Sequence, residues 1–368
     1  SPKTSGLPSV IHKATVEDLD QIYYPVAPII PFGEAVHERI NLEIMRGCPN
    51  ACRFCVSSRI KQPLRYRSVD KLLALAETIY EHTGYDEISL LSLSSGEYPW
   101  LDELLVRLNG RFKSRRVGVS LPSLRIDERL KNLPAILKTV RKAGFTIAPE
   151  AGCFLLRQVI DKQIEDQDIF ASVQAAYEQG WNLVKLYFMI GLPGETDDDI
   201  KAIVKMIQDI SALGRKVKGH LGRVNVTISV FTPKPHTPFQ WEPIAAMDEI
   251  SRKQTILRSE LKSNQIKLKF HNSERSHLEA VFCKGDRRLG RVLIEAWRSG
   301  CKFDAWDESF DYNKWQSAFE NCQIDPEFYA RRRRQYSETL PWNHIDSDIS
   351  PDKLWQEREA AFKLITQR

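Results

Sequence analysis

Three cysteines lie within eight residues of this 368-residue chain, and their spacing is its strongest chemical signal. Cys48, Cys52 and Cys55 form the pattern C-x3-C-x2-C. Soft thiolate ligands select zinc, copper(I) or iron–sulfur clusters. A structural zinc site takes four ligands, commonly from two C-x2-C pairs. The other cysteines stand far apart in the sequence: Cys153, Cys283, Cys301 and Cys322. The pattern therefore favours an iron site with an open position over a closed zinc site.

The run from Arg46 to Cys55, with Phe54 before the third cysteine, resembles the radical S-adenosylmethionine (SAM) superfamily. The resemblance implies that the three cysteines hold a four-iron four-sulfur (4Fe-4S) cluster whose fourth iron binds the amino and carboxylate groups of SAM. It also implies that an electron from the cluster cleaves SAM to a 5′-deoxyadenosyl radical, and that Phe54 packs on the adenine. A chance cysteine cluster or a partial zinc site is the alternative.

Apolar strands alternate with amphipathic helices between about residues 38 and 231, which predicts a parallel sheet built from βα units. The strands are expected at 40–45, 87–93, 117–121, 145–148, 183–190 and 224–230. The cysteine loop directly follows the first strand, at the edge where βα loops gather in a TIM-like barrel. We therefore predict an α/β fold, a partial (β/α)6 radical SAM barrel followed by a mostly helical C-terminal domain.

Polar or glycine residues follow the strand ends, and the resemblance gives several of them roles in binding SAM. Ser95, Gly96 and Glu97 stand in the place of the superfamily's glycine-glycine-glutamate element, whose oxygens take the SAM ammonium. An ordinary strand-to-helix turn is the alternative for this stretch. Ser120, at the end of the third strand, is a further candidate cofactor-binding residue.

The fourth and fifth strands also end in candidate SAM-binding residues. Glu150 lies where a carboxylate can hold the ribose hydroxyls. Arg157 is a candidate partner of the SAM carboxylate, because a guanidinium fork matches a carboxylate in bidentate fashion; a solvated charge on a helix face is its alternative. Ile190 and Gly191 begin a loop, 190–196, that resembles the adenine-lining loop of the superfamily, although glycines there also serve simply to make the turn.

Three segments are predicted: an N-terminal linker or extension at 1–37, the barrel at 38–242 and a helical extension at 243–368. The proline-rich stretch 231–241 cannot be a central strand, and it resembles the barrel endings of methylthiotransferases and of cobalamin-associated radical SAM proteins. Beyond residue 245 only helices are expected, at 247–264, 276–282, 286–298, 312–321, 326–336 and 351–365. The strings at 285–290, 301–306 and 340–346 resemble an uncharacterised bacterial radical SAM family whose longer members commonly carry a cobalamin-binding-like domain before the barrel.

The helical extension is dense in polar and aromatic residues. Several of these residues could line a substrate pocket or hold a second cofactor, and a core or capping role is the alternative for each. They are His271, His277, Asp304, Trp306, Asp307, Trp342, His344 and Asp346. Cys283, Cys301 and Cys322 match no cluster spacing, so buried structural thiols are expected. The four arginines at 331–334 either contact phosphates or form a solvated or salt-bridged helix face.

Composition sets broad limits on partners and location. The 53 basic and 48 acidic residues give a formal net charge of +5, which permits an anionic partner without implying nucleic acid. Unpaired cysteines suit a reducing cytoplasm, and no apolar run reaches the length of a membrane span. The start at Ser1 carries neither a signal peptide nor an initiator methionine, which is typical of a processed or excised fragment. The chain lacks an Asp-x-His-x-x-Gly motif, so cobalamin, if it acts, is expected through a domain upstream of Ser1.

These features predict a radical SAM enzyme that methylates or methylthiolates an RNA or a translation-related macromolecule. An electron donor of the flavodoxin or ferredoxin type is the expected protein partner. Two alternatives stand beside this prediction: a cobalamin-linked radical SAM enzyme that acts on a small molecule, and a noncatalytic iron–sulfur or RNA-binding module.

Overall fold

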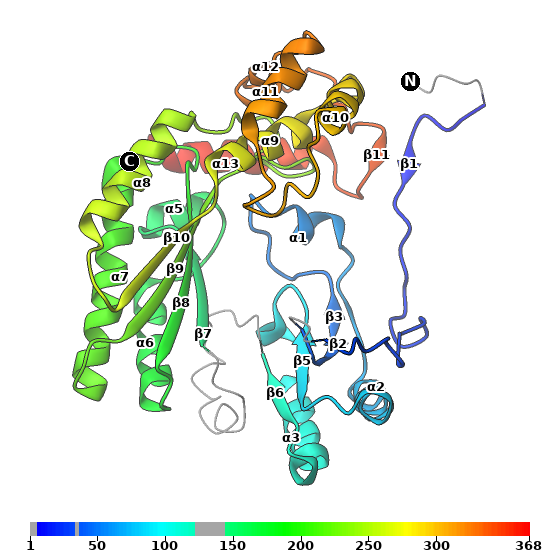
Figure 1. Ribbon diagram of the computed structural model, residues 1–368, viewed down its shortest axis with the longest axis vertical. Coiled ribbons are helices and arrows are strands. Elements are labelled where there is room, and N and C mark those ends of the chain that lie inside the picture. Colours follow the sequence, from blue (N-terminus) through cyan, green and yellow to red (C-terminus); the bar gives the residue numbers. More distant parts are fainter. Residues whose placement is uncertain (1–5, 34–36, 122–143) are drawn as a thin grey trace.

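Two parallel sheets form the framework of the protein, whose computed structural model describes residues 6–33, 37–121 and 144–368 (Figure 1). The first sheet has the order β2-β5-β6. Its strands are β2 (Ile40–Glu43), β5 (Glu87–Leu91) and β6 (Gly118–Ser120). The second sheet has the order β10-β9-β8-β7. Its strands are β7 (Phe145–Glu150), β8 (Leu183–Ile190), β9 (Arg223–Val230) and β10 (Ile266–Phe270). The segment 122–127, after the third predicted strand, lies outside the described residues.

The α/β class and the six predicted strands are confirmed. The expectation of helices alone beyond residue 245 is wrong at β10 and at the two-residue strand β11 (Ile345–Asp346). Ile266, Leu268 and Phe270 alternate with lysines, which is the period of two that a half-buried strand needs. The stretch pairs in parallel with β9, from Ile266 opposite Val224 to Phe270 opposite Ile228. The second sheet therefore continues one strand further than predicted.

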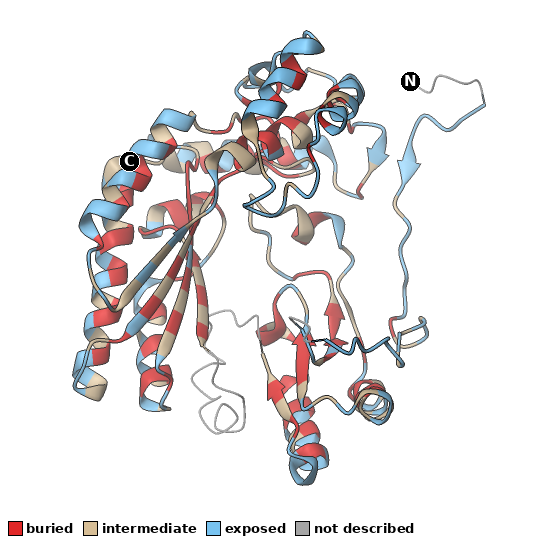
Figure 2. Cartoon of the chain, in the orientation of Figure 1, coloured by how far each residue is buried: buried red, intermediate tan, exposed pale blue. Residues whose placement is uncertain are grey.

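Helices cover one face of each sheet (Figure 1). The first sheet is covered by α2 (Val69–Thr83) and α3 (Leu101–Phe112), and the second by α6 (Asp166–Glu178) and α7 (Asp197–Lys218), with α8 (Met247–Glu260) packed against α7. Helix α7 begins with a capping box, in which Thr196 and Asp199 satisfy each other's backbone amides. These helices bury alternate apolar side chains of the strands, which form one continuous core (Figure 2).

The other face of the second sheet is polar. In β8, Val184, Leu186 and Phe188 are fully buried on the helix-covered face, so Lys185 and Tyr187 point to the opposite side. Those two residues pair in register with Asn225 and Thr227 of β9, which are half-buried. A complete (β/α)8 barrel fills its interior with branched apolar side chains. This partial barrel instead leaves a polar inner face.

Shorter elements lie before and among the main strands and helices of the barrel. They are β1 (Ile11–His12), β3 (Met45–Arg46), α1 (Val56–Ile60), β4 (Arg65–Tyr66), η1 (Ser95–Glu97), η2 (Lys113–Arg115) and α5 (Phe154–Val159). The extension contains α9 (Ser273–Lys284), α10 (Leu289–Arg298), α11 (Tyr312–Asn321), α12 (Pro326–Ala330), β11 (Ile345–Asp346) and α13 (Pro351–Thr366). Strand β1 pairs in parallel with β11, so the N-terminal segment lies along the extension. In the described part of the chain, no helix has the length and apolar character needed to cross a bilayer.

Candidate functional site

The cysteine loop connects β3 to α1. Strand β3 pairs with β4 in antiparallel fashion, which closes the base of the loop. Gly47 has a φ of +99°, and a Cβ there would lie 3.0 Å from Leu64 Cα, so this position requires glycine. Cys48 is buried, Cys52 and Cys55 are half-buried, and Cys55 directly precedes α1 without a capping hydrogen bond from its thiol. Within the described residues, no cysteine forms a disulfide.

The loop is fastened to the second half of the barrel. The Arg53 amide donates a hydrogen bond to the Ile160 carbonyl at 2.9 Å. The Arg53 guanidinium donates to the carbonyls of Gln158 and Val159 at 2.8 and 2.9 Å, at the end of α5. These bonds join the loop, which leaves the first sheet, to the carboxyl end of the second. A loop held at both ends positions its thiols before any ligand binds.

The donor set of the loop is three thiols, which are the ligands that hold iron–sulfur clusters in proteins. In the described part of the chain, no group of three or more His, Cys, Asp or Glu side chains is placed to hold a single metal ion. Burial raises the pKa of the Cys48 thiol, and the Asn50 amide lies 3.5 Å from its sulfur. Metal binding would therefore have to displace the proton of a thiol that is neutral in the unliganded loop.

The turn after β5 reaches the cysteine loop through Glu97. Its Oε2 accepts a hydrogen bond of 2.6 Å from the same Asn50 amide that lies beside Cys48. Ser95 is fully buried, and its hydroxyl lies 2.8 Å from that of Ser92. Gly96 is buried as well. The structure thus brings the Glu97 side chain to the cysteine loop, while Ser95 hydrogen-bonds within its own turn.

Ser120 and Glu150 already have partners inside the protein. The Ser120 hydroxyl donates to Glu87 Oε1 at 2.8 Å. Glu150 ends β7 with a φ of +69° and forms an ion pair of 2.9 Å with Lys162. Both residues lie at strand ends, where a ligand of the barrel would bind, and their assignment to SAM stays a prediction.

Arg157 is fully buried. Its alternative role, a solvated charge on a helix face, is therefore wrong. Its Nε donates to the Ile164 carbonyl at 2.8 Å and its Nη1 to the Ala151 carbonyl at 3.1 Å, while Nη2 pairs with Asp166. All three guanidinium nitrogens are therefore engaged. In this conformation Arg157 stabilises the turns around α5, and a contact with the SAM carboxylate would require some of these bonds to open.

The loop after β8 contains a buried ion pair that was not predicted from the sequence. Ile190 is buried, and Gly191 has a φ of +83° and donates its amide to Glu195 Oε2 at 2.6 Å. Glu195 also pairs with Lys253 of α8 at 2.8 Å, and both side chains are only 1% exposed. Burial raises the pKa of Glu195 to about 7, against the attraction of Lys253. One feature of the sequence could have predicted a buried ion pair. Lys253 is a charged residue that lies between Ile250 and Leu257 on the apolar face of α8.

Phe54 packs among side chains from the strand ends. It contacts a buried cluster that includes Leu156, Met189, Leu192 and Phe231. This cluster lies where β7, β8 and β9 end, so the aromatic ring of the cysteine loop is placed at the carboxyl edge of the second sheet. The predicted contact between Phe54 and an adenine ring stays a prediction.

The polar residues of the extension do not gather into one site. His277 contacts Tyr312 at 3.0 Å and Glu327 at 2.8 Å. Trp342 donates to Gln240 at 2.7 Å. Asp346 pairs with His12 at 3.1 Å, Trp306 is 62% exposed, and His344 is exposed as well. Asp304 is half-buried, with one carboxylate oxygen unsatisfied. His271 and Asp307 line a common pocket.

The four arginines at 331–334 do not form a helix face, because α12 ends at Ala330. Arg331 donates to the Ile244 carbonyl at 2.8 Å, and Arg332 forms a bidentate pair with Glu338. Arg333 pairs with Glu242 at 3.0 Å, and Arg334 is buried. The structure therefore favours the salt-bridged alternative over a phosphate-binding patch. Of the outlying cysteines, Cys301 is buried as expected, while Cys283 and Cys322 are half-buried.

Comparison with known proteins finds a family match within the barrel. Residues 42–207 match the radical SAM superfamily. An uncharacterised protein of Methanocaldococcus jannaschii is 34% identical over 283 residues, which are 76% of this chain and 59% of that protein. A ribosomal protein uS12 methylthiotransferase, RimO, of Thermoanaerobacter sp. is 22% identical over 46% of this chain and 40% of its own length. The chain thus spans about half the length of these relatives.

Two solved structures show a more distant likeness. The radical SAM methyltransferase TsrM of Kitasatospora setae, solved with cobalamin and a [4Fe-4S] cluster, has a TM-score of 0.49 and 11% identity, covering 77% of this chain and 60% of that one. The cobalamin-dependent radical SAM enzyme OxsB has a TM-score of 0.44 and 12% identity, covering 89% of this chain and 53% of that one.

Proposed function

We propose that this chain, whose residues 42–207 form a domain of the radical SAM superfamily, is part of an enzyme that cleaves SAM reductively to modify an RNA or a translation-related macromolecule. A 4Fe-4S cluster and SAM are the cofactors of this superfamily. The observation that carries the proposal is the cysteine loop, which presents three thiols at the carboxyl edge of parallel strands inside the matched region.

The chain's own residues would bind and orient the cofactors. Cys48, Cys52 and Cys55 would each bind one iron as a thiolate. A cluster held by these thiolates would supply the electron that the reductive cleavage of SAM requires. Arg53 would hold the loop against α5, and Phe54, beside the apolar strand ends, would keep water from the adenine.

The relatives support a macromolecular substrate. RimO proteins, which match almost half of this chain, are methylthiotransferases of ribosomal protein uS12. We propose methylation or methylthiolation as the reaction, with a flavodoxin- or ferredoxin-type protein as the electron donor. If the reaction uses cobalamin, we propose that another domain supplies it, since these 368 residues contain no Asp-x-His-x-x-Gly motif.

Anaerobic reconstitution of the chain tests the cofactor assignment. We expect about four irons per chain, and an electron paramagnetic resonance spectrum of the reduced cluster that changes when SAM is added. Cys52→Ala should lose the cluster and the release of 5′-deoxyadenosine, because one iron loses its ligand. Cys153→Ala is the control, since the Cys153 thiol already donates to Asp199 at 2.9 Å. Zinc bound in place of iron, or a spectrum that does not change when SAM is added, would contradict the proposal.

A further inference from the structure

The side chain of Asn50 lies between a sulfur and a carboxylate of the candidate site. Its Nδ2 is 3.5 Å from Cys48 Sγ and 2.6 Å from Glu97 Oε2. The amide nitrogen of an asparagine side chain carries two hydrogens, so it can donate one to each of these acceptors. The backbone amide of Asn50 also hydrogen-bonds to the Cys48 sulfur. One residue therefore joins the cysteine loop to the turn after β5.

Other side chains hold the backbone of the cysteine loop around Asn50. The Gln62 amide donates to the Cys48 carbonyl at 2.8 Å. The Arg59 guanidinium donates to the Ala51 carbonyl at 2.7 Å. The carbonyls on both sides of Asn50 are thus fixed by residues outside the loop. The bonds of the Asn50 side chain reach only a sulfur and a carboxylate, so its effect on the site is expected to be electrostatic.

Cys48 and Glu97 bring two negative charges close together once Cys48 binds iron as a thiolate. The Glu97 carboxylate is close enough to act on the Cys48 sulfur through its charge, and it opposes negative charge there. Asn50 and Glu97 are half-buried, so water screens this repulsion less than it would at an open surface. Reduction adds an electron, and hence more negative charge, to a cluster and its thiolates. Net charge and hydrogen bonds to the sulfurs are among the factors that set the reduction potential of iron–sulfur clusters.

We propose that Asn50 is a positioning residue that raises the reduction potential of a cluster bound to this loop. It would do so by donating one hydrogen bond to the Cys48 thiolate and another to Glu97, so that the carboxylate opposes the entering electron less. The inference rests on the proposed function, because it requires a cluster on the three cysteines. It assigns a role to a residue that is neither an iron ligand nor a predicted SAM-binding residue.

A redox titration of the reconstituted chain without SAM, followed by electron paramagnetic resonance, tests this inference. At the midpoint potential of the parent chain, Asn50→Ala should lower the ratio of reduced to oxidised cluster about tenfold, which is about 59 mV for a one-electron couple. Glu97→Gln introduced into Asn50→Ala should recover most of this loss, because it removes the charge that repels the electron. A side chain that served only to shape the loop would not be compensated by this second change.

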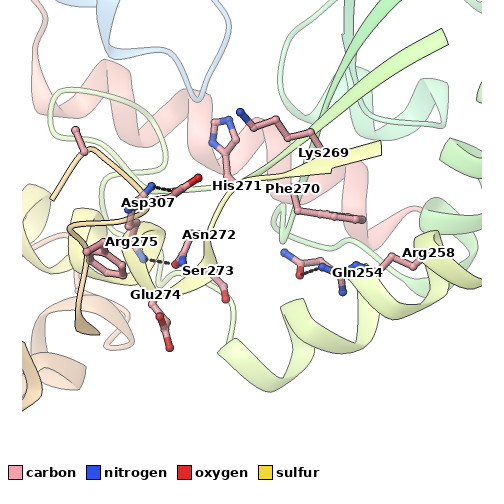
Figure 3. A pocket seen from close by; sticks show the side chains of 12 residues that line it. Gln254, Arg258, Lys269, Phe270, His271, Asn272, Ser273, Glu274, Arg275 and Asp307 are labelled. Carbon is pink, nitrogen blue, oxygen red and sulfur yellow. Dashed lines mark hydrogen bonds and ion pairs between the residues drawn. The ribbon is translucent and has the colours of Figure 1, made fainter. Parts of the chain in front are cut away.

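Asn272→Ala is the matched control. Asn272 lines a pocket beside β10, the edge strand of the second sheet (Figure 3). It caps α9 by accepting the Arg275 amide at 3.0 Å, so its replacement by alanine costs some stability. The control thus makes the same substitution with a structural cost but away from the Cys48 sulfur. Its midpoint potential should equal that of the parent chain.

The outcomes separate this inference from the proposed function. An unchanged potential in Asn50→Ala, or a double variant whose potential stays as low as that of Asn50→Ala, would overturn the role of Asn50 alone. If neither variant binds iron although circular dichroism shows that both fold, the side chain is needed to assemble the cluster rather than to set its potential, and the inference is wrong. A parent chain that holds no SAM-responsive cluster would overturn the proposed function itself.

Discussion

At the scale of single residues, the buried pair of Glu195 and Lys253 is an unusual feature of the strand ends. The Glu195 side chain is 1% exposed, and it accepts hydrogen bonds from the Gly191 amide and the Lys253 ammonium. Lys253 also contacts a second carboxylate, Glu249, at 2.6 Å. One ammonium shared by two carboxylates does not fully compensate the burial of Glu195, which is why the pKa of Glu195 rises to about 7.

This pKa predicts a specific pH dependence of stability. Between pH 4.5 and about 7 the folded protein keeps a proton on Glu195 that the unfolded chain has released. The contribution of Glu195 to the free energy of unfolding should therefore fall as the pH rises through this range, by up to about 3 kcal/mol. Urea unfolding of the parent chain and of Glu195→Gln at several pH values measures the difference. A difference that does not change with pH would mean that Glu195 is ionised throughout.

At the scale of elements, the turn between β7 and α5 lies directly against α7. A Cβ on Gly152 would lie 2.3 Å from the Ile203 amide nitrogen and 2.7 Å from the Ala202 carbonyl carbon. Both atoms belong to the backbone of α7, so no side chain can move aside. The close approach of this turn fixes α7, and with it the loop at 190–196 that precedes the helix.

Gly152→Ala should therefore destabilise the protein, by about 1–3 kcal/mol or more, because α7 must shift as a unit. Gly110→Ala in α3 is the matched control, since a Cβ there meets nothing within 4 Å. That control should stabilise the protein by about 0.5–1 kcal/mol through helix propensity. Urea unfolding measures both variants. Equal stability of Gly152→Ala and the parent chain would show that α7 is not fixed by this contact.

At the scale of the whole molecule, the last helix supports the cysteine loop. Glu357 of α13 forms a bidentate pair with Arg59 of α1, at 2.5 and 3.0 Å. Arg59 in turn donates to the Ala51 carbonyl inside the loop at 2.7 Å. Residues almost 300 positions apart are thus joined within the candidate site. The extension is part of the architecture that positions the thiols.

Glu357→Ala should weaken this support, because it leaves the Arg59 side chain, which is 6% exposed, without its carboxylate. The expected decrease in unfolding free energy is about 1–3 kcal/mol, and the reconstituted chain should lose iron faster to a chelator. Gln356→Ala, an exposed neighbour on α13, should change neither quantity. If Glu357→Ala has the same unfolding free energy and the same iron retention as the parent chain, α13 does not hold the loop.

Features that depend on local spacing were predictable from the amino-acid sequence. The C-x3-C-x2-C pattern lies on one loop, so its position after the first strand could be predicted from neighbouring residues alone. The six strands were predictable because alternation and apolar runs report the local period. The same period was present at Ile266–Phe270, and the missed β10 reflects a short strand placed among long helices.

The pairing of charged groups, by contrast, emerges only when the chain is folded. Periodicity tells which face of an element is buried but not what lies across from it. Arg157 is therefore buried against Asp166 rather than solvated, and Arg333 finds Glu242 rather than a phosphate. Lys253 and Glu195, and likewise Arg59 and Glu357, come from distant parts of the sequence. These pairings arise when the folded elements pack together, because removing charges from water is favourable only where a partner is already in place.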